Sequence, residues 1–81
     1  MTMFFVYILQ SRKTNRYYTG SAQDLTGRVR EHNAGESRST RAGIPWDLVY
    51  SKGYQTRAEA VRMEKTIKAR GAGRFLNALS R

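Results

Sequence analysis

Residues 3–21 read MFFVYILQSRKTNRYYTGS, and this stretch decides the fold. Its first part, residues 3–9, is a continuous apolar run with β-branched and aromatic members, which predicts a strand buried on both faces. The polar residues 10–16 predict a hairpin loop, and residues 17–21 predict the returning strand. Gly20, near the end of that strand, allows another backbone or a ligand to approach closely. We therefore expect a β-hairpin at the start of the chain.

A helix should follow the hairpin. Ser21 and Asp24 both resemble its N-cap. The helix should continue to about Asn33, where Ala34-Gly35 ends it, and Gly27 inside it costs about 1 kcal/mol relative to alanine. The remaining elements are expected, in order, as a polar and basic loop over residues 36–43, a strand over 46–54, a helix from the cap at Thr56 to about Arg70 and, after a break at 71–73, a short helix over 74–80. The order β-β-α-β-α-α predicts an α+β fold with a small, three-stranded, mainly antiparallel sheet flanked by helices.

Length and composition fit one small domain over residues 1–81. The absence of cysteine excludes a disulfide framework and a thiolate metal site, and it fits a reducing cytoplasm. Apolar runs are too short for a membrane span, so we expect no association with a membrane. The net charge of +9 favours a polyanionic partner, usually nucleic acid, although a protein with simply a high pI shows the same balance.

Two polar side chains share the apolar face of the first predicted helix. At 100° per residue, Leu25, Val29, Arg28 and His32 fall within one arc of roughly 100°. Leu25 and Val29 should face the sheet. Arg28 and His32 should therefore flank the core instead of pointing into solvent.

A carboxylate interrupts the apolar stripe of the second predicted helix. The stripe consists of Ala60, Val61, Met63 and Ile67, and Glu64 lies between them. A carboxylate at such a position must be paired, bound to a metal or placed at an opening in the core, because burying it alone is costly. An ion pair with Arg28 or with a lysine and a functional role both remain open.

Taken singly, none of these residues is specific: a strand tyrosine such as Tyr7 or Tyr18 usually packs, and a histidine such as His32 usually forms a structural hydrogen bond. Together they resemble the GIY-YIG nuclease family, in its small, single-domain YhbQ-like branch. The matching segments are Phe5-Val6-Tyr7-Ile8-Leu9, Tyr18-Thr19-Gly20, residues 24–33 with Arg28 and His32, Leu48-Val49-Tyr50, residues 59–68 with Glu64, and Asn77. The chain departs from the usual family residues at Phe5-Val6, Thr19, Ser21 and Gly27.

The resemblance implies a GIY-YIG fold and a one-metal hydrolysis of a phosphodiester. Glu64 would hold Mg²⁺ or Mn²⁺, with water as the other ligands. Tyr7, with Tyr18 beside it, would accept or relay a proton from the attacking water. Arg28 would bind the phosphate and stabilise the transition state, and His32 would orient the tyrosine or contact the phosphate.

The expected partner is nucleic acid, with DNA preferred, and the oligomeric state stays open. Candidates for contacts with the phosphate backbone are Arg38, Arg41, Lys65, Lys68, Arg70 and Arg74. Two alternatives to a nuclease remain: a nucleic-acid-binding module that kept the fold without turnover, and a structural or protein-interaction domain whose charge is incidental.

Overall fold

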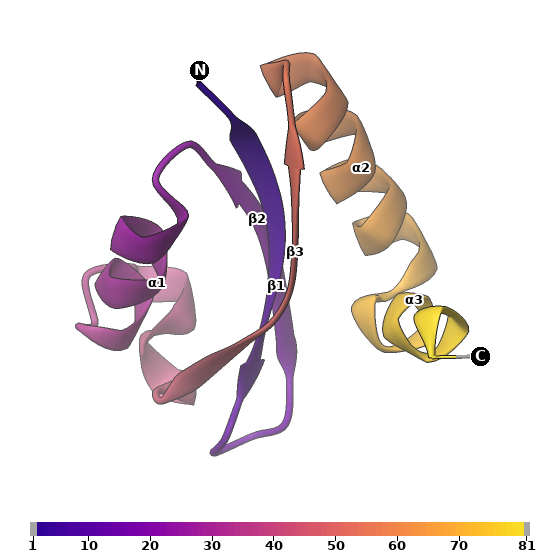
Figure 1. The fold of residues 1–81 in the computed structure, drawn as a ribbon. Helices are drawn as coiled ribbons and strands as arrows, with labels where there is room; N and C mark the ends of the chain where they lie inside the picture. The colour runs from indigo at the N-terminus through magenta and orange to yellow at the C-terminus, as the bar shows by residue number, and fades with distance from the viewer. Residues whose placement is uncertain (1, 81) are drawn as a thin grey trace.

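The computed structural model describes residues 2–80. Its elements are, in order, β1 (Phe4–Ser11), β2 (Tyr17–Ala22), α1 (Leu25–Asn33), the 3₁₀ helix η1 (Arg38–Gly43), β3 (Trp46–Tyr54), α2 (Arg57–Arg70) and α3 (Ala72–Leu79) (Figure 1). The fold is α+β, and the predicted order of strands and α-helices is confirmed. None of the helices in residues 2–80 has the length and apolar character needed to cross a bilayer.

The sheet has the order β2-β1-β3, and β1 is antiparallel to both neighbours. The apolar run predicted as a strand with two buried faces is therefore the central strand. Val6, Ile8 and Leu9 are fully buried, and Tyr7 is 2% exposed. The predicted strand over residues 46–54 forms the second edge with the bounds that the sequence indicated.

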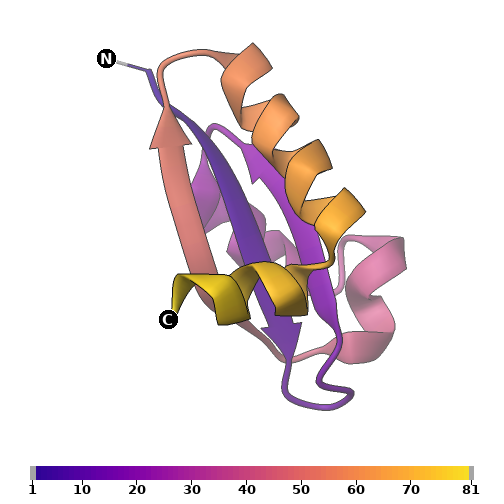
Figure 2. The ribbon, with the colours of Figure 1, turned by 90° about the vertical axis from the view of Figure 1, so that its right-hand side faces the viewer.

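Helices cover both faces of this sheet and give the molecule three layers. Figures 1 and 2 show α1 and η1 on one face, and α2 and α3 on the other. Because side chains alternate along a strand, Val6 and Ile8 pack against Ile67 on the α2 face. Tyr7 and Leu9 pack with Trp46 on the α1 face. Tyr7 thus lies on the opposite face from the helix that carries Glu64.

The segment predicted as a loop over residues 36–43 contains the 3₁₀ helix η1. This correction has a physical reason, because the segment is fixed by buried hydrogen bonds that its polar composition does not reveal. Thr40 is 1% exposed, and its carbonyl accepts a hydrogen bond from Trp46 Nε1 at 2.8 Å. Gly43 packs directly against the indole of Trp46, where a Cβ would collide with the ring.

Asp24 is the N-cap of α1: its carboxylate accepts a hydrogen bond from the backbone N–H of Gly27 at 3.0 Å. Ser21, the competing candidate, lies in β2. A Cβ at position 27 would collide with the Asp24 carboxylate. The glycine that lowers helix propensity therefore leaves room for the cap.

The capping box of α2 forms as predicted, because Thr56 Oγ1 accepts from the backbone N–H of Glu59 at 3.2 Å and donates to its carboxylate at 2.9 Å. The break after α2 is shorter than expected. Gly71 alone separates the helices, with a φ of 96° that favours glycine, and α3 starts at Ala72. The chain changes direction at this residue, and α3 then runs across the sheet next to α2 (Figure 2).

Candidate active site

Three buried polar side chains are linked by hydrogen bonds in the interior of the α1 face. Tyr7 comes from β1, His32 from the last turn of α1, and Thr40 from η1. The Tyr7 hydroxyl lies 3.0 Å from His32 Nε2, and Thr40 Oγ1 lies 2.8 Å from His32 Nδ1. All three residues are at most 2% exposed. Both nitrogens of the only histidine in the sequence are therefore held by side chains from other elements.

These hydrogen bonds select one tautomer of His32. The Thr40 hydroxyl donates to the carbonyl of Ser37 at 3.4 Å, so it accepts from Nδ1–H of His32. His32 Nε2 is then free to accept the phenol proton of Tyr7. In the resting protein the phenol donates to a neutral imidazole.

Burial supports the same protonation states. Burial and, after it, the positive charge of Arg28 lower the pKa of His32, so the imidazole is neutral near pH 7. Burial and the nearby Tyr18 raise the pKa of the Tyr7 phenol, whereas the charge of Arg28 acts against this increase. Ionising Tyr7 therefore needs a proton acceptor at its hydroxyl, and His32 occupies that position.

Tyr18 joins this cluster from the edge strand β2. Its ring centroid lies 4.8 Å from that of His32 and 6.3 Å from that of Tyr7. Gly20 is directly opposite Tyr7 in the sheet, and a Cβ there would lie 2.7 Å from the Tyr7 hydroxyl. The group that approaches this glycine closely is thus the phenol of Tyr7.

Arg28 is more exposed than predicted. Leu25 and Val29 are half-buried against the core, and His32 is buried, but Arg28 is exposed. An arc of about 100° includes the rim of a helix face as well as its centre, which explains the difference. The charge of Arg28 still lowers the pKa of both Tyr7 and His32. Arg28 therefore lies beside the cluster with its side chain open to solvent.

Glu64 is paired with a lysine, one of the two partners left open by the sequence. Its Oε2 lies 2.8 Å from Lys68 Nζ, and its Oε1 accepts a hydrogen bond from Ser21 Oγ at 2.8 Å. The Glu64 side chain is 19% exposed and that of Lys68 is 56% exposed. The Glu64 hydrogen bond is the largest cause of the raised pKa of Lys68. Glu64 thus sits at an opening along the β2 edge.

The Glu64 carboxylate is chemically suited to a divalent cation. Each of its oxygens uses one acceptor position and keeps another, and a carboxylate is the hard oxygen ligand that Mg²⁺ and Mn²⁺ prefer. Within residues 2–80 no group of three or more histidine, cysteine, aspartate or glutamate side chains gathers as a metal site. The negative charge of Glu64 contributes to the raised pKa of Tyr7, so the two groups interact although they approach from opposite faces.

The predicted contacts to nucleic acid are all exposed, but they form two groups. Arg38 and Arg41 lie on η1, on the α1 face, and Arg41 Nε donates to the carbonyl of Gly35 at 2.9 Å. The other group lies on the α2 face and consists of Lys65, Lys68, Arg70 and Arg74. Lys68 is exposed and also forms the ion pair with Glu64.

Sequence reasoning missed three residues that support this site: Thr40, Ser21 and Asn33. Thr40 fixes the tautomer of His32, and Ser21 holds Glu64. Asn33 adds a third support, because its side-chain amide both donates to and accepts from the backbone of Trp46, at 3.0 and 2.6 Å. No periodicity marks these residues, because each acts through a hydrogen bond to another element.

The sequence and the fold are those of a GIY-YIG domain. A family model described as the GIY-YIG catalytic domain matches residues 3–73, so the chain belongs to the GIY-YIG family, a nuclease superfamily.

The chain is similar in sequence to small proteins named UPF0213. The chain is 39% identical over 69 residues to the UPF0213 proteins of Staphylococcus aureus strains Mu3 and N315, covering 84% of this chain and 83% of each relative. The solution NMR structure of a UPF0213 protein from Bacillus halodurans matches with a TM-score of 0.60 and 28% identity, covering 96% of this chain and 83% of that one. The relatives confirm the small, single-domain branch of the family.

Proposed function

We propose that this protein is a divalent-metal-dependent nuclease that hydrolyses phosphodiester bonds, with DNA as the preferred substrate. One observation carries the proposal: the buried Tyr7 phenol donates to a neutral His32, whose other nitrogen is fixed by Thr40. A tyrosine in this arrangement can give up its proton although burial raises its pKa.

The chain of hydrogen bonds supports a proton relay. As a water attacks the phosphorus, its proton passes to the Tyr7 oxygen while the phenol proton passes to His32 Nε2. His32 becomes a cation, and Thr40 keeps the ring in place because it accepts from Nδ1–H in both states. Tyr18 packs beside both rings from the edge strand β2 and helps to hold them in position for this transfer.

Charge stabilisation comes from two sides. Arg28 is exposed beside the cluster, where its guanidinium can bind a phosphate oxygen in two contacts and stabilise the charge of the transition state. Glu64 would hold Mg²⁺ or Mn²⁺, which supplies neutralisation of charge on the phosphate and the leaving oxygen when bound. Lys68 would then be released from Glu64 and become available for a phosphate contact.

Binding would rely mainly on charge. The exposed basic residues of η1, α2 and α3 can contact phosphates without reading base identity. Affinity should fall steeply as salt increases, with roughly one counterion released per contact.

We place the activity in the cytoplasm.

A cleavage panel tests the proposal. Labelled duplex, branched and single-stranded DNA and the matching RNAs are incubated with the protein, with Mg²⁺, with Mn²⁺ and with a chelator. We expect metal-dependent cleavage, and DNA cut in preference to RNA. Binding without cleavage of any member under all conditions would contradict the proposed activity.

The Glu64–Lys68 ion pair favours one alternative, a nucleic-acid-binding module in which Glu64 is structural. In that case loss of the carboxylate lowers stability and leaves any activity proportional to the folded protein. In a nuclease it removes cleavage and leaves the fold intact. Thermal melting measured beside cleavage therefore separates the two.

A further inference from the structure

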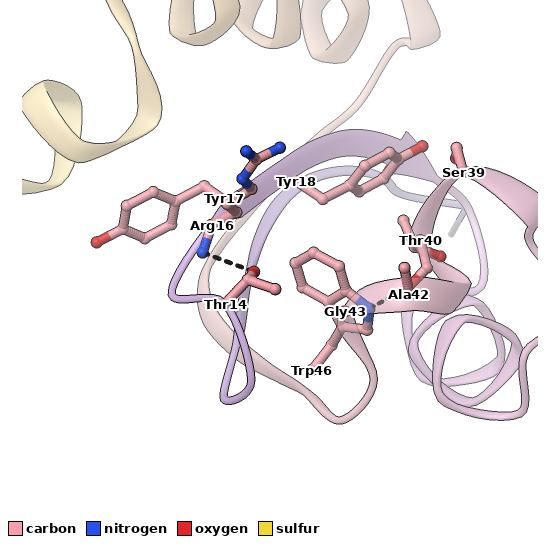
Figure 3. A pocket seen from close by; sticks show the side chains of 9 residues that line it. All are labelled: Thr14, Arg16, Tyr17, Tyr18, Ser39, Thr40, Ala42, Gly43 and Trp46. Carbon is pink, nitrogen blue, oxygen red and sulfur yellow. Dashed lines mark hydrogen bonds between the residues drawn. The ribbon is translucent and has the colours of Figure 1, made fainter.

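A cavity of about 470 Å³ opens on the α1 face between the β1–β2 hairpin and η1 (Figure 3). Its volume is in the range of sites that hold a small ligand. Tyr18 and Trp46 face the hollow from opposite sides, and Thr40, Ala42 and Ser39 line it from η1, whereas the ring of Tyr17 points away (Figure 3). Arg16 lies at its hairpin side.

The lining matches the chemistry of a nucleobase with its phosphate. The half-buried ring of Tyr18 provides an aromatic surface for stacking, which every base can use, and Trp46 lines the cavity with the 8% of its surface that is exposed. The hydroxyl of Ser39 can donate to or accept from the polar edge of a base. Arg16 is an exposed cation that can pair with the attached phosphate, and none of the roles assigned above uses it.

The cavity shares two side chains with the proposed active site. Tyr18 packs on His32 with ring centroids 4.8 Å apart and also faces the cavity. Thr40 bonds to His32 Nδ1 and lines the same cavity. A group held there would therefore lie next to the Tyr7–His32 relay.

We propose that this cavity receives an unpaired nucleobase of the substrate strand, next to the phosphate to be cleaved. This inference rests on the proposed nuclease function and narrows it to single strands or duplexes with an unpaired nucleotide. A base inside an intact duplex has both of its faces stacked and its edge paired, so it must leave the helix before it can enter this cavity and stack on Tyr18. An unpaired base avoids that cost.

Trp46 allows the occupant to be detected directly, because it is the only tryptophan in the sequence and lines the cavity. The full chain, kept in chelator so that no cleavage occurs, is titrated with a short single-stranded DNA, the same strand with abasic sugars, the matching duplex and a free nucleoside monophosphate. Trp46 fluorescence reports occupation of the cavity, and anisotropy of a label on each nucleic acid reports total binding.

We expect the single strand to change Trp46 fluorescence and to bind roughly tenfold or more tightly than the abasic strand, as expected for loss of base–aromatic stacking. The abasic strand and the duplex should bind through charge without the fluorescence change. Equal binding of normal and abasic strands without a fluorescence change would overturn the proposal. An equal change in Trp46 fluorescence with the duplex would also overturn it. So would a free monophosphate that gives this change and binds as tightly as the single strand.

A pair of substitutions supplies the control. Ala42→Leu adds volume inside the cavity, whereas Ala58→Leu makes the same change on an exposed position of α2 outside it. Ala42→Leu should remove the preference for the base-containing strand, and Ala58→Leu should keep it. Equal preference in both variants, each shown by melting to be folded, would refute the cavity. A fluorescence change without cleavage under any metal condition would support the cavity and contradict the nuclease, so the two proposals can fail separately.

Discussion

The two faces of the sheet have different interiors. On the α2 face the buried residues are Val6, Ile8 and Ile67, covered by further apolar and aromatic side chains. On the α1 face the buried set includes His32 and Thr40, linked by hydrogen bonds to Tyr7. Both faces have an apolar cluster, but the α1 face also buries this hydrogen-bonded set, and buried polar groups are stable only when hydrogen-bonded. The comparison predicts that substitutions of the hydrogen-bonded residues on the α1 face reduce activity, and that substitutions of the apolar residues on the α2 face reduce stability.

The largest effect on cleavage should come from Glu64, which lies on α2 and is the proposed ligand of the metal. Glu64→Gln keeps size and helix propensity, so the melting temperature should change little while metal-dependent cleavage disappears. Binding to nucleic acid should persist or tighten, since a negative charge near the phosphate is removed. A variant that melts early but still cleaves in proportion to its folded fraction would assign Glu64 to structure and contradict its role as the metal ligand.

Arg28→Ala should follow in size. Loss of a preorganised donor to the transition state reduces turnover on the order of 10²–10³-fold. Binding should weaken only modestly, because one of many cations is lost. Arg28 is exposed, so melting should match the unsubstituted protein. Near-normal turnover in a single-turnover cleavage assay would remove Arg28 from the site.

Ile67→Ala tests the opposite face. Ile67 is fully buried between α2 and the sheet, and its truncation should lower the free energy of unfolding by about 2–5 kcal/mol. Leu79→Ala is the control, because Leu79 is 55% exposed and should change little. Denaturant unfolding measures both. Cleavage per folded molecule should be unchanged in Ile67→Ala; a specific loss of turnover there would break the division between the faces.

Thr40→Val should give the smallest loss of rate, since it leaves Tyr7 and His32 in place. The substitution keeps the shape but removes the acceptor for His32 Nδ1–H, so the ring loses its fixed tautomer. An unsatisfied buried donor costs about 1–3 kcal/mol, and turnover should fall while substrate affinity holds. Thr40→Ser restores the hydroxyl and should restore turnover. Equal loss in both variants would show that Thr40 acts by packing alone.

Most of the fold follows from local signals in the sequence. The run at residues 3–9 is apolar at every position, and only a central strand with two covered faces needs this. The caps at Asp24 and Thr56 mark the helices because both bonds involve residues three apart. The 3₁₀ helix over residues 38–43 is missed because the hydrogen bonds that fix it involve His32 and Trp46, which belong to other elements.

The candidate site was less predictable than the fold. Helical geometry places His32 on the inner face of α1, but it does not separate the buried position of His32 from the exposed position of Arg28. The spacing of Glu64 and Lys68 allows an i,i+4 ion pair, yet it cannot choose between that pair and a metal. The roles of Tyr7, Tyr18, Arg28, His32 and Glu64 in catalysis stay predictions.

The buried Tyr7 phenol also sets a limit on the conditions in which this fold persists. Its pKa is raised in the folded protein, mainly by burial, whereas in the unfolded chain it ionises near 10. The unfolded chain therefore releases this proton first as the solution becomes alkaline, and stability that is complete below about pH 10 declines above it. The tyrosine that would serve as proton relay is thus an alkaline weak point of the fold. Melting curves recorded across pH 8–12 should show this decline, and Tyr7→Phe should reduce its slope.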